Sequence, residues 1–233
     1  MEMSDGLTYF KNIYDVVPDW VQKMHDYHAD ALSHYTALRS DIMKDGSLST
    51  KEKDLLLVGM NAARLYERSM VYHTKSAMNQ GATIPELVEY LLIPYVYNGE
   101  EALKIAFKSL ECALSFEDTA VTEDGSLEEI LIRMIQLMRN EDTSFIEKLL
   151  ESVRAGDPMF VENLFKEGIV SSKLKYILMA GIYTVELQGG AAGKWIDAGR
   201  EIGVSEEELV EMGLISMLTA GIPAWFETSD SLL

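Results

Sequence analysis

The sequence is short of cysteine, of basic residues and of long apolar runs, and each shortage excludes a class of protein. Its single cysteine, Cys112, cannot form a disulfide within the chain, which fits a reducing compartment. Lysine and arginine total 20 against 38 aspartate and glutamate residues, giving a formal net charge of −18. A surface this acidic repels phosphate backbones and anionic lipids, so we expect neither nucleic acid nor a membrane as a partner.

Two further absences concern where the protein resides. No apolar run of the length needed to cross a bilayer occurs in the sequence, so we expect no membrane-spanning helix. The first residues lack a basic segment followed by an apolar stretch, and they therefore predict no signal peptide. Together with the single cysteine, these features predict a cytoplasmic protein.

The pattern of apolar residues predicts an all-α fold, because it has helical periodicity and no alternation of the kind that strands show. One proline, Pro94, falls inside a helical pattern and is expected to kink or end that helix. The predicted helical segments are Leu7–Met43, Ser49–Thr83, Ile84–Tyr97, Glu100–Ser115 and Leu127–Val153.

The segment Ser49–Thr83 is the most informative part of the chain. It opens with a hydroxyl cap at Ser49 and places Asp54 near the first turn, while Gly81 closes it. A set of residues within it recurs at helical spacing and should share one face, which combines an imidazole, a phenol and a hydroxyl with apolar groups. The members of this face are Tyr66, Ser69, Met70, His73 and Ala77.

Two parts of the chain repeat at one offset. Lys166–Lys173 is similar to Lys44–Lys51, and Gly203–Glu211 is similar to Gly81–Glu89; 166 − 44 and 203 − 81 both equal 122. A shared offset predicts a tandem duplication, with a first repeat in residues 1–120 and a second in residues 121–233. The acidic and polar stretch Phe116–Gly125 is the predicted linker.

The offset also compares the two repeats residue by residue. His73 corresponds to Trp195 and Asp54 to Tyr176. Tyr66 and Ser69 correspond to Gln188 and Ala191. The second repeat thus lacks the titratable groups of the first, so any chemistry is expected in the first.

His73 is the leading candidate for proton transfer, because the ordinary pKa of histidine lies near neutrality. The alternative is a buried histidine that bonds only a backbone carbonyl. Asp54 could orient His73, or it could simply complement the positive end of a helix. The two residues are 19 positions apart, about 28 Å along a straight helix, so they can meet only if the helix breaks or bends sharply. The expected place is between Asn61 and Tyr66.

Other polar residues have less specific patterns. Arg64 and Arg68 could hold an anionic substrate or be solvated surface charges. A histidine group near the start, which lacks carboxylates at matching spacing, does not predict a metal site; it consists of His25, His28 and His34. Cys112 lies in an apolar helical pattern and is expected to pack without reacting. No cofactor is expected.

The stretch LYERSMVYHTKSAMNQGATIPEL, with Asp54 before it, resembles the carboxymuconolactone decarboxylase and alkylhydroperoxidase D-like family. The redox members of that family carry C-x-x-C-x-x-x-H here. Counting back from His73 places Tyr66 and Ser69 at the two cysteine positions. A peroxidase label can follow from the family, but this chain lacks the thiol pair that such chemistry needs.

The resemblance implies the helical unit of that family and a cofactor-free decarboxylase, or a related lyase, that acts on a small carboxylated lactone. His73 would then move the proton, with Asp54 orienting it. Tyr66 and Glu67 form a pair similar to that of the decarboxylase branch, and Tyr66 would bind the substrate. Glu67 lies about 100° round the helix from Tyr66 and could instead pair with Arg64 or a neighbouring helix. Ser69, Arg64 and Arg68 complete the expected substrate-binding set. The alternative is a non-catalytic ligand-binding or assembly protein on the same scaffold.

We predict a homo-oligomer, with a trimer favoured, because a duplicated chain needs half as many subunits to build the trimeric or hexameric rings of single-unit relatives. The apolar segment Leu214–Phe226 is the expected interface. Light scattering at micromolar concentration should give a mass near three times 26.1 kDa. A single 26.1 kDa species would contradict this prediction.

Overall fold

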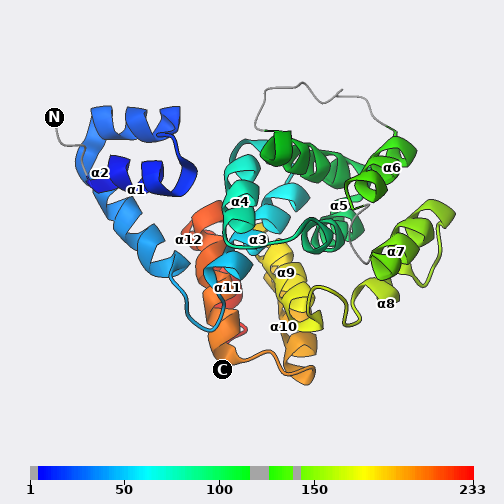
Figure 1. Cartoon of the computed structure of the whole chain (residues 1–233). Coiled ribbons are helices and arrows are strands. Elements are labelled where there is room, and N and C mark those ends of the chain that lie inside the picture. Colours follow the sequence, from blue (N-terminus) through cyan, green and yellow to red (C-terminus); the bar gives the residue numbers. More distant parts are fainter. Residues whose placement is uncertain (1–4, 116–125, 139–142) are drawn as a thin grey trace.

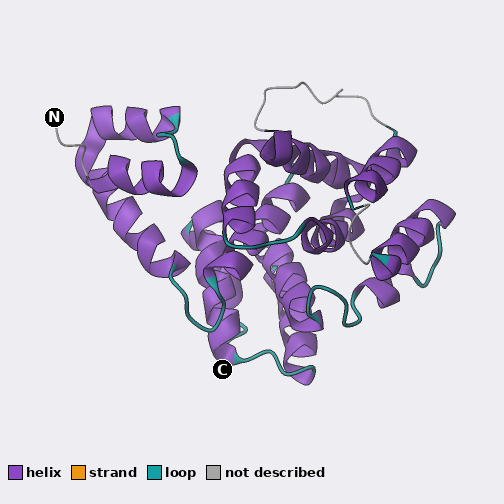
Figure 2. Cartoon of the chain, in the orientation of Figure 1, coloured by secondary structure: helices purple, strands orange, loops and turns teal. Residues whose placement is uncertain are grey.

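The computed structural model of the chain describes residues 5–115, 126–138 and 143–233. Those residues form helices and no strand, which confirms the all-α prediction (Figures 1 and 2). The predicted linker, 116–125, lies outside the described residues. The helices are α1 (Asp5–Tyr14), α2 (Asp19–Met43), α3 (Thr50–Ala63), α4 (Glu67–Asn79), α5 (Ile84–Ser115), α6 (Leu127–Leu137), α7 (Ser144–Ala155), α8 (Phe160–Leu164), α9 (Ser172–Val185), α10 (Gly189–Glu201), α11 (Glu206–Ala220) and α12 (Ile222–Ser229).

The predicted start of the central helix is a capping box. The Ser49 side chain accepts a hydrogen bond from the Glu52 amide, and the Glu52 carboxylate accepts one from the Ser49 amide at 2.8 Å. Two amides that the helix leaves without partners are thereby satisfied. The cap fixes where α3 begins, and Asp54 lies in the first turns of this helix.

The expectation that Pro94 kinks or ends its helix is wrong in position. Helix α5 continues through Pro94, and its non-helical residues are Asn98 and Gly99. Gly99 has φ 67°, a left-handed value that costs glycine little. Proline removes one backbone donor, and complete burial of Leu92 and Ile93 holds the helix together around it.

Helix ends recur at the offset that the sequence indicates. Helix α9 begins and ends 122 residues after α3, and α10 begins and ends 122 residues after α4. The connections match as well, because Leu65 between α3 and α4 and Leu187 between α9 and α10 both have φ 56°. The duplication of the chain stays a prediction. If it is right, α9 and α10 are the counterparts of α3 and α4.

A buried lysine in each half pairs with a glutamate from the other half. Lys53 of α3 forms an ion pair with Glu211 of α11 at 3.1 Å, and Lys175 of α9 forms one with Glu89 of α5. Each glutamate also accepts two backbone amides of the loop before the opposite helix. The amides are those of Ser47 and Leu48 for Glu211, and of Ile169 and Val170 for Glu89. The two halves are therefore joined by reciprocal polar contacts.

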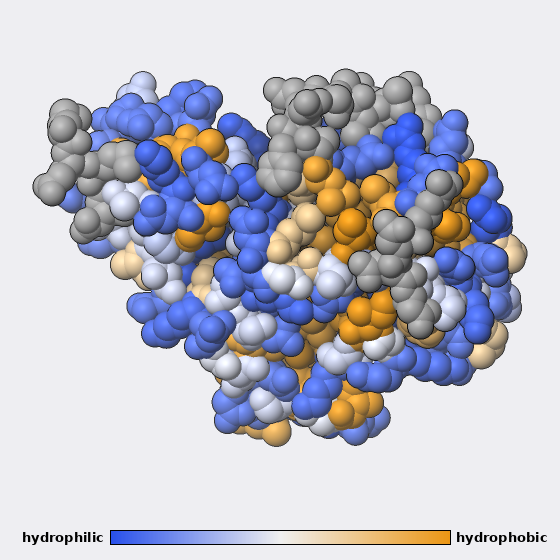
Figure 3. Space-filling model, viewed as in Figure 1, coloured by the Kyte–Doolittle hydropathy of each residue, from blue (hydrophilic) through white to orange (hydrophobic). Residues whose placement is uncertain are grey.

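The hydrophobic core is divided unequally. One large cluster contains residues from α3, α5, α9 and α11, so both predicted repeats contribute to the same core. A separate small cluster lies in the hairpin of α1 and the first part of α2, which stands to one side of the body in Figure 1. It consists of Leu7, Phe10, Tyr14, Val21 and Leu32. Figure 3 shows hydrophobic residues at the surface of both parts, separated by hydrophilic ones.

Within the described residues, no helix is long and apolar enough to cross a membrane. Two large apolar side chains of α12 are nevertheless more than half exposed, Ile222 at 53% and Phe226 at 57%. They lie in the segment that the sequence analysis expects at an interface.

We predict that the two ion pairs differ in their effect on stability. Lys175 and Glu89 are both 0% exposed, whereas the Glu211 side chain is 20% exposed. Lys175→Met leaves a fully buried carboxylate without its cation and should lower the free energy of unfolding by about 3–5 kcal/mol. Lys53→Met should lower the free energy of unfolding by less, because water can solvate the Glu211 carboxylate that loses its partner. Urea denaturation of both variants measures the difference.

The double variant Lys175→Met, Glu89→Gln is the control. It removes both charges, so it should recover part of the loss. If Lys175→Met and Lys53→Met lower the free energy of unfolding equally, burial of the ion pair does not determine how much it contributes to stability.

Candidate functional site

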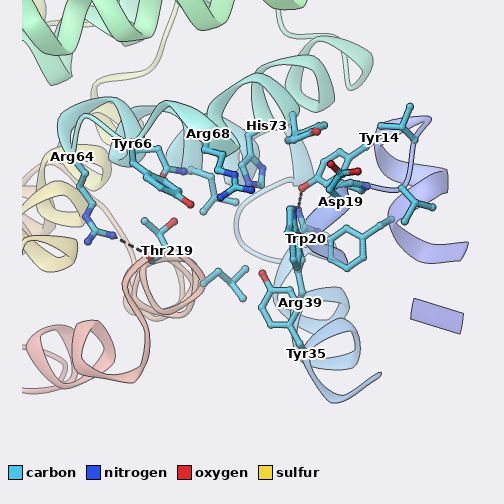
Figure 4. Close-up of a pocket in the computed structure, with 18 residues that line it drawn as sticks. Tyr14, Asp19, Trp20, Tyr35, Arg39, Arg64, Tyr66, Arg68, His73 and Thr219 are labelled. Carbon is cyan, nitrogen blue, oxygen red and sulfur yellow. Dashed lines mark hydrogen bonds between the residues drawn. The ribbon is translucent and has the colours of Figure 1, made fainter. Parts of the chain in front are cut away.

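A pocket of about 920 Å³ lies between the N-terminal hairpin and the body of the protein. Helices α1 and α2 form one side, α3 and α4 another, and α11 contributes from the second half of the chain. Its lining is mainly aromatic and cationic (Figure 4). The aromatic residues are Phe10, Tyr14, Trp20, Tyr35, Tyr66 and Tyr72, and the charged or titratable ones are Asp19, Arg39, Arg64, Arg68 and His73.

His73 and Asp54 are hydrogen-bonded in this structure. The distance from His73 Nδ1 to Asp54 Oδ1 is 2.9 Å, and the Ser76 hydroxyl donates to Asp54 Oδ2 at 2.6 Å. Asp54 is 1% exposed, and His73, at 7%, lines the pocket. An ionised carboxylate only accepts hydrogen bonds, so the Nδ1 of His73 carries the proton. In neutral His73 the other ring nitrogen, Nε2, is then a proton acceptor.

The contact depends on a break in the helical segment. Helix α3 ends at Ala63, Leu65 takes a left-handed φ of 56°, and α4 begins at Glu67. The amide of Tyr66 donates to the carbonyl of Asn61 at 2.9 Å, which closes the turn. The break lies in the interval where the sequence analysis expected one. It converts a separation of about 28 Å along a straight helix into a direct hydrogen bond.

Burial lowers the pKa of His73 below its ordinary value of 6.5. The hydrogen bond and the charge of Asp54 oppose this change, and the positive charge of Arg39 adds to it. His73 is therefore neutral at pH 7, with Nε2 able to accept a proton. This is the form that a general base requires.

The family relationship follows from the part of the chain that builds this contact. Residues 29–111 match the model of the carboxymuconolactone decarboxylase family. This segment is similar to that family. It includes Asp54, His73 and Ser76, and it excludes α1 and the first ten residues of α2, Asp19–His28. No curated protein matches the chain.

Several predicted binding residues of the carboxymuconolactone decarboxylase segment line the pocket. Tyr66 is 50% exposed there. Arg64 donates to the carbonyl of Thr219 at 3.0 Å and pairs with Glu186 at 3.3 Å, so contacts to the second half of the chain hold it in place. Arg68 is exposed and also lines the pocket.

Two other predicted residues of the family segment are placed differently. Glu67 forms an ion pair with Lys108 of α5 at 2.9 Å and is not part of the pocket lining. Ser69 belongs to α4, but its side chain lies outside the described part of the structure. The structure therefore brings together His73, Asp54, Tyr66 and the two arginines, without Glu67.

Sequence reasoning missed Arg39, Tyr14 and Ser76. Ser76 lies three residues after His73, a helical spacing that places it on a neighbouring part of the same face. Arg39 and Tyr14 had no such signal, because they come from different helices of the hairpin. Only the packing of α1 on α2, with Arg39 donating to the Tyr14 hydroxyl at 2.9 Å, brings them into the pocket.

The related positions of the second half hold an aromatic cluster. Trp195 stacks at a tilt on Phe165, with ring centroids 5.0 Å apart, and meets Tyr176 edge-on at 5.5 Å. These rings occupy the positions that correspond to His73 and Asp54. Among the described residues, no three or more His, Cys, Asp or Glu side chains gather as a group that could hold a metal ion.

We predict that His73 has a pKa below 6.5 in the folded protein and that Asp54→Asn lowers it further. The substitution removes the hydrogen bond and the charge that raise this pKa. A pH titration of the His73 ring by NMR measures both values. A pKa above 6.5, or one that rises in Asp54→Asn, would contradict the assignment.

The same shift has a consequence for stability. The unfolded state takes up a proton on His73 at a higher pH than the folded state, so stability increases with pH in that window. His73 should contribute fully above about pH 6.5 and lose its contribution as the pH falls toward its folded-state value. His73→Gln should lack this part of the pH dependence in urea denaturation.

Proposed function

We propose that the protein is a cofactor-free acid–base catalyst that acts on a small carboxylated molecule, with decarboxylation of a carboxylated lactone as the leading reaction. The observation that carries the proposal is the hydrogen-bonded pair of His73 and Asp54, 2.9 Å apart, at a pocket with three arginines in its lining. The family of the segment 29–111 supports the same class of chemistry.

The proton transfer can be assigned to individual atoms. Loss of carbon dioxide breaks a carbon–carbon bond and leaves the electron pair on the substrate, where a proton must then be delivered. Neutral His73 first takes up a proton from solvent on Nε2, and Asp54, bonded to Nδ1, stabilises the imidazolium that forms. After carbon dioxide has left, Nε2 passes this proton to the carbon that carries the electron pair. The lowered pKa makes this imidazolium a stronger acid than ordinary histidine, which favours delivery of the proton. Ser76 keeps the Asp54 carboxylate oriented.

Binding of the substrate is assigned to the remaining lining residues. Arg64 and Arg68 attract a carboxylate, and the Tyr66 hydroxyl can donate a hydrogen bond to a lactone oxygen. Thiol-dependent peroxide reduction is not proposed, since a chain with one cysteine has no dithiol to oxidise.

The second candidate function is a non-catalytic binding or assembly protein. It is favoured by the aromatic cluster of Trp195, Tyr176 and Phe165, which gives the second half a packed site instead of a titratable one. Under this proposal the pocket binds a ligand that is never converted.

We further propose that the chain is a tandem duplication that assembles as a trimer. The helix ends at one offset and the reciprocal pairs of Lys53 with Glu211 and Lys175 with Glu89 support the first part. The exposed Ile222 and Phe226 support an interface on α12.

We predict that His73→Gln lowers the rate of carbon dioxide release from a responsive carboxylated lactone by about 10²–10⁴-fold. Glutamine keeps an N–H donor for Asp54 but cannot exchange a proton near neutral pH. The measurement is a panel of carboxylated lactones with and without the variant. His34→Gln, at an exposed histidine of α2, is the matched control and should retain the wild-type rate.

Two outcomes would reject the catalytic proposal. One is turnover that His73→Gln leaves unchanged. The other is saturable binding of the lactones with no release of carbon dioxide, which would favour the second candidate.

A further inference from the structure

Arg39 is a buried cation at the pocket. It lies on α2, is 3% exposed, and is part of the lining. Its Nη1 donates to the Tyr9 hydroxyl at 2.8 Å and its Nη2 to the Tyr14 hydroxyl at 2.9 Å. Both partners come from α1, so the hairpin holds the guanidinium by two hydrogen bonds in a fixed orientation.

The partners of Arg39 do not balance its charge. Burial raises the pKa of Tyr14 to about 12, so its phenol is neutral at pH 7. Within the described part of the chain no carboxylate forms an ion pair with Arg39, and Asp54, whose charge reaches it, is bonded to His73 and Ser76. A buried guanidinium without a counterion is costly, and an anion in the pocket would offset that cost.

The surroundings indicate what kind of anion fits. The Arg39 guanidinium carbon lies 5.7–5.8 Å from the ring centroids of Tyr9, Phe10 and Tyr14. Trp20 meets Phe10 edge-on at 5.1 Å and also lines the pocket. These rings form flat, apolar walls beside the charge, which suit a planar organic body attached to a small anionic group.

Tyr14 connects the cation to the proton-transfer residue. Its ring meets that of His73 edge-on, with centroids 6.2 Å apart. Figure 4 shows Tyr14 and Arg39 on the same side of the pocket as His73, away from Arg64 and Tyr66. Because the Tyr14 oxygen accepts from Arg39, its own hydrogen can point to a ligand.

We propose that Arg39 and Tyr14 form a carboxylate-binding subsite beside His73, which takes a small planar organic acid and is distinct from Arg64. The claim that this subsite holds the carboxylate of the substrate rests on the proposed function. The claim that it binds an organic anion does not, because binding can be measured without turnover. Tyr14 and Tyr9 precede residue 29, so residues outside the family segment complete this subsite. The hairpin thereby adds ligand specificity to the family unit.

The alternative is that Arg39 is only a structural tie between α1 and α2. The two roles make opposite predictions for stability. If Arg39 is a structural tie, its replacement by an apolar side chain lowers the stability of the protein. If Arg39 is a cation that lacks its ligand, the same replacement does not lower the stability, because it removes a buried charge.

The test is the melting temperature of the full chain with benzoate and with benzamide, its neutral analogue. Benzoate should raise the melting temperature with concentration, and benzamide should not. Arg39→Met should abolish the response to benzoate and, without benzoate, melt no lower than the wild type. Tyr14→Phe keeps the ring, loses one hydrogen bond to the ligand, and should weaken benzoate binding about tenfold. Arg133→Met, at an exposed arginine of α6, controls for net charge and should keep the full response.

Specific outcomes overturn the subsite. They are equal shifts with benzoate and benzamide in the wild type, a full benzoate response in Arg39→Met, or a destabilised Arg39→Met together with an unresponsive wild type. If Arg39→Met does not fold, the wild-type comparison decides, together with Arg39→Lys. That variant keeps the charge without the planar fork and should bind benzoate at least tenfold more weakly.

Failure of the subsite can be told apart from failure of the proposed function. His73→Gln cannot transfer the proton but keeps Arg39 and Tyr14. Its dissociation constant for benzoate should stay within about threefold of the wild-type value, because the variant keeps every charged hydrogen bond proposed for benzoate. Benzoate binding that depends on Arg39 supports the subsite whether or not any lactone is turned over. Turnover in a protein whose benzoate response ignores Arg39 rejects the subsite and leaves the catalytic proposal intact.

Discussion

The left-handed turn at Leu65 is the constraint on which the site depends. It follows the end of α3 at Ala63 and sends α4 back along it, so that Asp54 and His73, distant along any continuous helix, come within 2.9 Å. The tautomer of His73, and with it the availability of Nε2 for a proton, follows from that one contact. The burial that lowers the pKa of His73 also results from the two helices packing together.

The pocket has a charge opposite to that of the whole protein. The chain carries a formal net charge of −18, yet the lining of the pocket contains Arg39, Arg64 and Arg68. Each arginine is placed by different contacts: the tyrosines of α1 hold Arg39, and a carbonyl of α11 holds Arg64. An acidic exterior repels anions at long range, so selection of an anionic ligand has to come from this local arrangement.

The two halves of the molecule have helices at matching positions, but only the first half carries the His73–Asp54 pair. Reciprocal contacts of Lys53 with Glu211 and of Lys175 with Glu89 join them, and each glutamate satisfies loop amides of the other half. Where the first half buries His73, the second packs Trp195 among aromatic rings. The second half therefore contributes stability and one wall of the pocket, through α11, while the titratable groups come from the first.

The helical class, the capped start at Ser49 and the candidate His73 could be predicted from the sequence, because they follow from periodicity and local chemistry. The sequence also located the interval in which a helix break was needed. It expected Pro94 to kink or end its helix, but the helix continues through Pro94, and the non-helical residues are Asn98 and Gly99, between the predicted segments Ile84–Tyr97 and Glu100–Ser115. The contact of Asp54 with His73, the ion pair of Glu67 with Lys108 and the place of Arg39 in the pocket became known only from the packed structure. Contacts between separate helices depend on how their faces pack, and they leave no periodic signal in the chain.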